Sequence, residues 1–355
     1  MTDAEHLIAN LSLPEDLSRA LEDPRYWRES VCRLLFKRVD ALASSDFQKY
    51  SDAAKGVCRL VDKIPRDANL STWLSLKARS LILVGAGSRL MCEFDQAEIS
   101  FRIACSLYGY LSPVERGDLF RRYSILRKDQ RRLSEAIRLA NVAIEIFEEC
   151  NSAKYVGYGL LDRGNFLYEM NRLREALDDY QEALCRLEGG VDSRGVYSAR
   201  HNIVMVHVDL FDGVSSSRHL EEMIATLRNQ TNPNDAIDLL KVDWLAARFQ
   251  RKLGNRKAAR DFLWRAMNGF RDLRMPFEAA LVMLDLAELY LINCRYEKLM
   301  VLAGETFSLF RALRVNREAF YALSIFHEAI VRRDLSSRII DSIREMLANT
   351  SRRAI

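Results

Sequence analysis

A repeat of about 40 residues is the feature of this sequence that most constrains its fold. One copy has Gly164 and Ala176 twelve residues apart, with Tyr180 and Ala183 following four and seven residues after Ala176. The pattern recurs in register, with anchors at Ala97, Ala136, Ala176, Ser216, Ala259 and Leu299, separated by 39, 40, 40, 43 and 40 residues. Such regularity is typical of stacked structural repeats and predicts an array of similar units.

The local pattern within each repeat is helical. Apolar residues recur at three- and four-residue spacing, and the six prolines fall between these periodic segments. Gly or Ala at a helix crossing allows two axes to approach at the short end of about 8–10 Å. We therefore predict an all-α fold of helix pairs, with Gly164 and Ala176 at the crossing within one pair and Ala183 against the next pair.

The segment GNFLYEMNRLREALDDYQEAL, residues 164–184, resembles the tetratricopeptide repeat (TPR). That family has a small residue in the first helix, Ala at the start of the second, an aromatic residue four positions later and Ala three beyond. The resemblance implies a right-handed α-solenoid of about seven antiparallel helix pairs. It covers residues 66–312, with an N-terminal helical cap at 1–65 and a C-terminal cap and tail at 313–355.

The sequence departs from the family pattern in two respects. The family unit has about 34 residues, whereas this period is about 40, so the helices or loops are expected to be longer. The aromatic position of Tyr180 and Phe101 is occupied elsewhere by smaller or aliphatic residues, and those copies must pack differently: Ala140, Leu220, Leu263 and Ala303.

Composition limits the class of protein. The formal net charge is +4 over 355 residues, which does not indicate nucleic-acid binding, and direct contact with nucleic acid is not expected. No apolar run approaches the roughly 18 residues of a membrane span, and the start MTDAEHLIANL is unlike a signal peptide. Seven cysteines at irregular spacing suggest buried free thiols. A cytoplasmic, bacterial protein is expected.

The inner groove of such a solenoid is lined mainly by the first helix of each pair. Positions three before, one after and four after each small residue share that face. They predict a partner-binding surface of cations, aromatic residues, an amide, a histidine and a methionine: Arg121, Lys128, Asn165, Tyr168, His201, Met205, Trp244, Arg248 and Arg251. This mixture favours an acidic or amphipathic peptide. In the alternative interpretation, Leu161, Met205 and Trp244 pack between helix pairs.

The family resemblance adds two residues to this surface. Co-chaperone TPR domains grip a terminal carboxylate with five side chains, and Asn165, Asn202 and Lys241 stand at three of those positions. Leu161 and Ala246 replace the two remaining cations, so a complete carboxylate clamp is not predicted.

Other segments that resemble chemical sites have simpler explanations. RRYSILRKDQRR, residues 121–132, has six basic residues that could engage phosphates. Because they are spread around a helix, the segment is predicted instead to be a solvated face. His201 and His207 are six residues apart and lack the further ligands of a metal site. No cofactor is predicted, and no arrangement of nucleophile, acid and base indicates an enzyme.

Two functional hypotheses follow. The first is a non-catalytic scaffold, or adaptor, that binds a partner protein or peptide along its concave groove and regulates it; self-association is left open. The alternative is a TPR regulator that senses a small molecule or peptide and acts through another chain, because the N-terminal segment lacks a clear DNA-recognition helix.

Overall fold

The computed structural model shows an all-helical chain. It describes residues 13–306 except 14, 43–46, 67–68, 190–192, 213–216, 233–234, 274, 294, 296–297, 300 and 303. Every regular element within this described part is a helix, as predicted. Helix contacts group the chain into two compact units that divide between Arg163 and Gly164. The predicted C-terminal cap, residues 313–355, lies outside the described residues.

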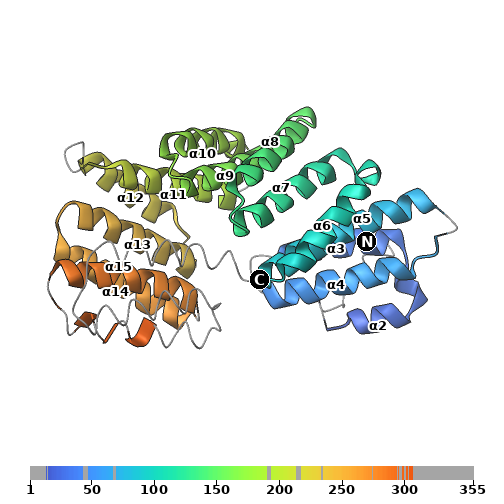
Figure 1. Cartoon of the computed structure of the whole chain (residues 1–355), viewed down its shortest axis with the longest axis horizontal. Helices are drawn as coiled ribbons and strands as arrows, with labels where there is room; N and C mark the ends of the chain where they lie inside the picture. The colour runs from blue at the N-terminus through green and yellow to red at the C-terminus, as the bar shows by residue number, and fades with distance from the viewer. Residues whose placement is uncertain are drawn as a thin grey trace. The chain divides into compact units, whose positions relative to one another are not determined.

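Unit 1 consists of helix pairs in which each helix packs on its neighbour in the chain (Figure 1). Helices α3 and α4, α5 and α6, and α7 and α8 form successive pairs. The elements are α2 (Leu17–Glu22), η1 (Pro24–Tyr26), α3 (Glu29–Leu42), α4 (Phe47–Lys63), α5 (Leu70–Leu90), α6 (Phe94–Ser106), η2 (Tyr108–Tyr110), α7 (Pro113–Asp129), α8 (Leu133–Glu149) and α9 (Ala153–Glu169), the last of which crosses the division.

Unit 2 continues the same construction. Helix α10 packs on α11, α11 on α12, α13 on α14 and α14 on α15. The helices are α10 (Leu173–Glu188), α11 (Ser193–Leu210), α12 (Ser217–Gln230), α13 (Ala236–Lys252), α14 (Arg256–Asp272) and α15 (Pro276–Ile292). The odd-numbered helices from α3 to α13 are the first helices of their pairs, and the even-numbered ones are the second helices.

The turn within a pair repeats with the period of the sequence. Cys92, Arg131, Asn171 and Gly254 each follow a first helix and have φ of 60°, 62°, 59° and 79°. A left-handed residue ends a helix and lets the chain reverse within a few residues. Helical pairs with the same turn are therefore produced at intervals of about 40 residues.

Small residues accommodate large rings where the two helices of a pair cross. A Cβ atom at Gly164 would lie 2.6 Å from the ring of Tyr180, and one at Gly85 would lie 3.0 Å from the ring of Phe101. Tyr180 and Phe101 are fully buried. The glycine on the first helix thus creates the space that the aromatic residue of the second helix fills. This explains why the glycine and the aromatic residue occur together in the repeat.

Copies without that aromatic residue use another glycine. In the α7–α8 pair, Ala140 stands at the aromatic position, and the large ring is Phe147, against which a Cβ at Gly117 would lie 2.3 Å away. In the α13–α14 pair the roles are exchanged, because Leu240 of the first helix packs on Gly269 of the second. In the pairs that depart from the family pattern, the two helices therefore still cross closely, but the glycine and the large side chain that packs on it lie at other positions.

The anchors lie in the core of each unit. Ala97, Ala136, Ala176, Ala259 and Leu299 are fully buried, as is Ala183, whereas Ser216 lies outside the described residues. The described helices include none that is long and apolar enough to cross a membrane. The prediction of buried thiols holds for Cys32 and is wrong for Cys92 and Cys185, which are exposed free cysteines.

Candidate functional site

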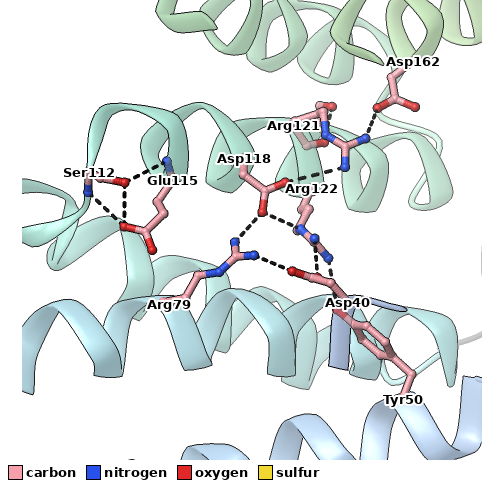
Figure 2. Close-up of polar contacts among 10 residues, drawn as sticks. Asp40, Tyr50, Arg79, Ser112, Glu115, Asp118, Arg121, Arg122 and Asp162 are labelled. Atoms are coloured by element: carbon pink, nitrogen blue, oxygen red, sulfur yellow. Dashed lines mark hydrogen bonds and ion pairs between the residues drawn. The ribbon is translucent and has the colours of Figure 1, made fainter. Parts of the chain in front are cut away.

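Charged side chains connect the first helices of unit 1. Arg79 of α5 contacts Asp40 of α3 at 2.6 Å and Asp118 of α7 at 2.5 Å, each 39 residues away in the chain. Arg122 completes the cluster, with Asp40 at 2.7 Å and Asp118 at 2.8 Å, and also donates to the hydroxyl of Tyr50 at 3.0 Å (Figure 2). The sequence repeat therefore places acids and arginines one period apart, where they meet.

The arginines of the cluster keep Asp118 ionised although it is buried. Burial alone would raise the pKa of Asp118, but Arg122, Arg79 and Arg121 outweigh that effect and hold the pKa well below its usual value. Only 8% of the Asp118 side chain is exposed. A buried carboxylate needs such partners, because an isolated charge in the protein interior costs several kcal/mol.

The basic segment at residues 121–132 is not the solvated face that its sequence suggests. Arg121 contacts Asp162 at 2.8 Å, and 19% of its side chain is exposed. Arg127 contacts Glu98 at 2.6 Å, and 9% of its side chain is exposed. The prediction is wrong because these arginines face neighbouring helices and pair with acids there.

A hollow of about 680 Å³ lies beside this cluster in unit 1. Residues of α3, α5, α7 and α9 line it, with Arg79, Arg121 and Arg122 on its walls. Among the described residues, the Nε atom of Arg121 has no hydrogen-bond partner, and it is buried. The Arg121 guanidinium lies 5.8 Å from the ring centre of Tyr158, which also lines the hollow.

A second cluster connects the first helices of unit 2, and its residues are again about one repeat period apart in the sequence. The hydroxyl of Tyr168 on α9 donates to Asp209 on α11, 41 residues away. Arg248 on α13 contacts the other oxygen of Asp209 at 2.6 Å, 39 residues further on. Burial raises the pKa of Tyr168. Tyr168 and Arg248, both predicted site residues, thus contact the same acid, Asp209, which was not predicted from the sequence.

Three other predicted site residues gather between α9 and α11. Asn202 donates its amide to Oδ1 of Asn165 at 3.1 Å, and Tyr180 donates its hydroxyl to the same oxygen at 2.8 Å. His201 lies beside them, with Nδ1 3.4 Å from Oδ1 of Asn202. Burial lowers the pKa of His201 to about 4, so the ring is neutral at pH 7. Its Nε2 atom is buried, and none of the residues that the structure describes forms a hydrogen bond with it.

The remaining predicted residues have partners within their own unit, either on the same helix or on a neighbouring one. Lys241 contacts Asp238 at 3.2 Å, and Lys128 contacts Asp129 at 2.8 Å. Met205 packs against the apolar core of α11 to α13. The indole of Trp244 donates to Asp285 at 2.5 Å, and Arg251 pairs with Glu288.

The cations of the predicted surface are therefore matched by acids of the same chain. Asp40, Asp118, Asp209 and Asp285 were missed by the sequence reasoning, which concentrated on cations, aromatic residues and amides. Their signal was available: each lies 39 or 41 residues from its partner, the period of the anchors. In the part of the chain that the structure describes, no group of three or more His, Cys, Asp and Glu side chains is placed to hold a metal ion.

Comparison with known proteins shows the fold. No protein-family model matches the chain, and no curated protein matches its sequence. A Rap protein complexed with Competence and Sporulation Factor is similar in structure, with a TM-score of 0.64, 13% identity, and coverage of 91% of this chain and 88% of that chain.

Two further solved structures agree. Aspartyl phosphate phosphatase F from Bacillus subtilis gives a TM-score of 0.56 at 11% identity, covering 94% of this chain and 92% of that chain. A signal-transduction ATPase with a tetratricopeptide repeat sensor from Pyrococcus horikoshii gives 0.50 at 14% identity, covering 96% and 53%. The chain has a TPR-like helical solenoid fold, as the sequence pattern predicted.

Proposed function

We propose that the chain is a TPR-like regulator that has no catalytic activity of its own and binds a peptide, or an extended segment of a partner protein, along the first helices of unit 2. The face consists of residues on α9, α11 and α13. The observation that carries the proposal is the group formed by Asn165, Asn202 and His201, because it holds a buried ring nitrogen that has no hydrogen-bond partner among the described residues.

The chemistry of this group suits a peptide backbone. Asn165 uses its carbonyl oxygen for Tyr180 and Asn202, which leaves its amide nitrogen to donate to a ligand. A neutral imidazole can donate to or accept from a peptide group, and the buried environment would strengthen each such bond. The similarity to a Rap protein crystallised with Competence and Sporulation Factor supports a binding role for this fold.

The ion pairs of unit 2 indicate what charge the bound peptide should carry. Arg248 is paired with Asp209, Arg251 with Glu288 and Lys241 with Asp238. Since these cations already have acidic partners, a largely uncharged or amphipathic segment fits this face better than a strongly acidic one.

Selection from a displayed library of short peptides tests the proposal. We expect peptides that bind the parent chain, and we expect Asn165→Ala and Asn202→Ala each to weaken the affinity about tenfold, because each removes a half-buried hydrogen-bonding group. Titration calorimetry measures the change. Asn268→Ala, an exposed amide on the second helix α14, is the matched control and should bind as the parent does. Equal weakening by all three variants, or no selected peptide, would contradict the proposal.

Two further measurements separate the adaptor from the sensor and test the absence of catalysis. Mass spectrometry of the chain purified from its native host should find either a stoichiometric partner protein, as an adaptor requires, or a peptide released on denaturation, as a sensor requires. One structural neighbour is named a phosphatase of aspartyl phosphate, so hydrolysis of acetyl phosphate is the relevant assay. We expect no turnover above the uncatalysed rate.

A further inference from the structure

The hollow of unit 1 has the composition of a site for anions. Six cations line it, Arg33, Lys37, Arg79, Arg121, Arg122 and Lys154. Three acids line it, Asp40, Glu115 and Asp118, and two more pair with its cations from outside the lining, Glu29 with Arg33 and Asp162 with Arg121. Its volume of about 680 Å³ is within the range of small-molecule sites, about 300–1,000 Å³. A concave surface lined by an excess of one charge concentrates ligands of the opposite charge.

The inner and outer cations have different surroundings. Arg79 and Arg122 are committed to Asp40 and Asp118, as Figure 2 shows. Arg33, Lys37 and Lys154 are exposed; Arg33 pairs with Glu29 at 2.7 Å, and the ammonium of Lys154 lies 6.0 Å from the ring centre of Tyr158. Glu115, the acid nearest in sequence to the cluster, has its carboxylate in the capping box of α7 with Ser112. A ligand entering the hollow therefore meets cations at its opening and the arginine cluster within.

Arg121 is the residue that most directly indicates a ligand. Its Nη1 atom donates to Asp162, whereas its Nε atom is buried with no hydrogen-bond partner in the part of the chain that the structure describes. Leaving a buried donor unsatisfied is costly, and natural proteins seldom do so without a reason. The ring of Tyr158 beside the guanidinium supplies an apolar surface that would exclude water from a bond at this atom.

We propose that this hollow binds a phosphate-bearing small molecule, with Arg121 donating to a phosphate oxygen and the exposed lysines Lys37 and Lys154 neutralising its remaining charge. Phosphate is favoured over a carboxylate because several cations converge on one opening, whereas a single carboxylate needs one partner. The site belongs to unit 1, so the proposal is independent of the peptide-binding face proposed on unit 2.

Titration calorimetry at low ionic strength tests the proposal with pyrophosphate and with ATP as the probes. We expect at least one of the two to bind, and stronger binding of ATP would identify a nucleotide rather than free phosphate as the source. Lys37→Glu combined with Lys154→Glu should weaken binding at least about tenfold, since two favourable charges become unfavourable. These residues are exposed, so the variant is expected to fold.

Arg121→Lys tests the buried donor, because it keeps a cation near Asp162 and removes the Nε–H group; it should weaken binding by about fivefold or more. Arg102→Glu, exposed on the second helix α6 of the same unit, is the charge-matched control and should leave binding unchanged. The proposal is overturned if neither probe binds, if Arg102→Glu weakens binding equally, or if a tetraglutamate peptide binds at Lys37 and Lys154 more tightly than either probe.

Discussion

Replacing Asp118 by asparagine is expected to lower the free energy of unfolding of unit 1 by about 3–5 kcal/mol. Asp118 is buried and accepts from Arg79 and Arg122, with Arg121 at 3.5 Å. Neutral asparagine keeps the shape and removes the charge, so that, of the described residues, Asp40 is then the one acid in contact with both Arg79 and Arg122. Removing one partner of a buried ion pair is costly because the opposite charge stays in the interior, and here two arginines would be left to share the single carboxylate of Asp40.

Urea denaturation, followed by circular dichroism, measures this change. Glu145→Gln on the second helix α8 is the control, since it also neutralises an acid of unit 1 but at an exposed position, and it should alter the free energy of unfolding by less than about 0.5 kcal/mol. A free energy of unfolding for Asp118→Asn equal to that of the parent would show that the charge cluster does not hold the first helices of unit 1 together.

Acid is expected to destabilise unit 2 through His201. Burial lowers the pKa of this histidine from 6.5 to about 4, so between these values the unfolded chain binds a proton that the folded chain does not. Stability is therefore fully present above pH 6.5 and is lost as the pH falls toward 4. Between pH 7 and pH 5 the loss amounts to about 2 kcal/mol, given about 1.4 kcal/mol for each unit of pKa shift.

The groups around His201 have opposing effects on its pKa. After burial, the hydrogen bond with Asn202 raises it, Lys241 and Arg248 lower it, and Asp238 raises it. His207 contributes in the same direction as His201, because burial and then His219 lower its pKa as well. The effect of His201 must therefore be isolated by comparison with His201→Gln.

Urea denaturation at pH 7 and pH 5 makes that comparison. The parent should lose about 2 kcal/mol more than His201→Gln between the two pH values. An identical pH dependence in the two proteins would show that His201 takes up its proton as readily in the folded chain as in the unfolded one.

The sequence predicted the helix pairs and their spacing because both depend on side-chain size. Gly164 against Tyr180 and Gly85 against Phe101 leave a direct trace, a small residue sixteen positions before a ring. The same trace explains why the pairs containing Ala140 and Leu263 were harder to interpret, since there the glycine lies at another position or on the other helix.

The charge clusters could not be predicted in the same way. Charges spread around a helix, as in residues 121–132, look solvated when that helix is considered alone, and burial of Arg121 and Arg127 depends on helices far away in the sequence. Asp209 was missed because an acid has no special spacing within its own helix. It becomes recognisable only when Tyr168 and Arg248 are compared with it one period away on either side.

Hydrogen exchange on the complex with a selected peptide tests whether unit 2 binds its partner along the first helices. Amides of α9, α11 and α13 are expected to gain protection when the peptide binds, while those of α10, α12 and α14 are expected to exchange as in the free chain. Protection confined to α10, α12 and α14 would contradict this expectation, because the ligand would then lie on the second helices, away from Asn165, His201 and Asn202.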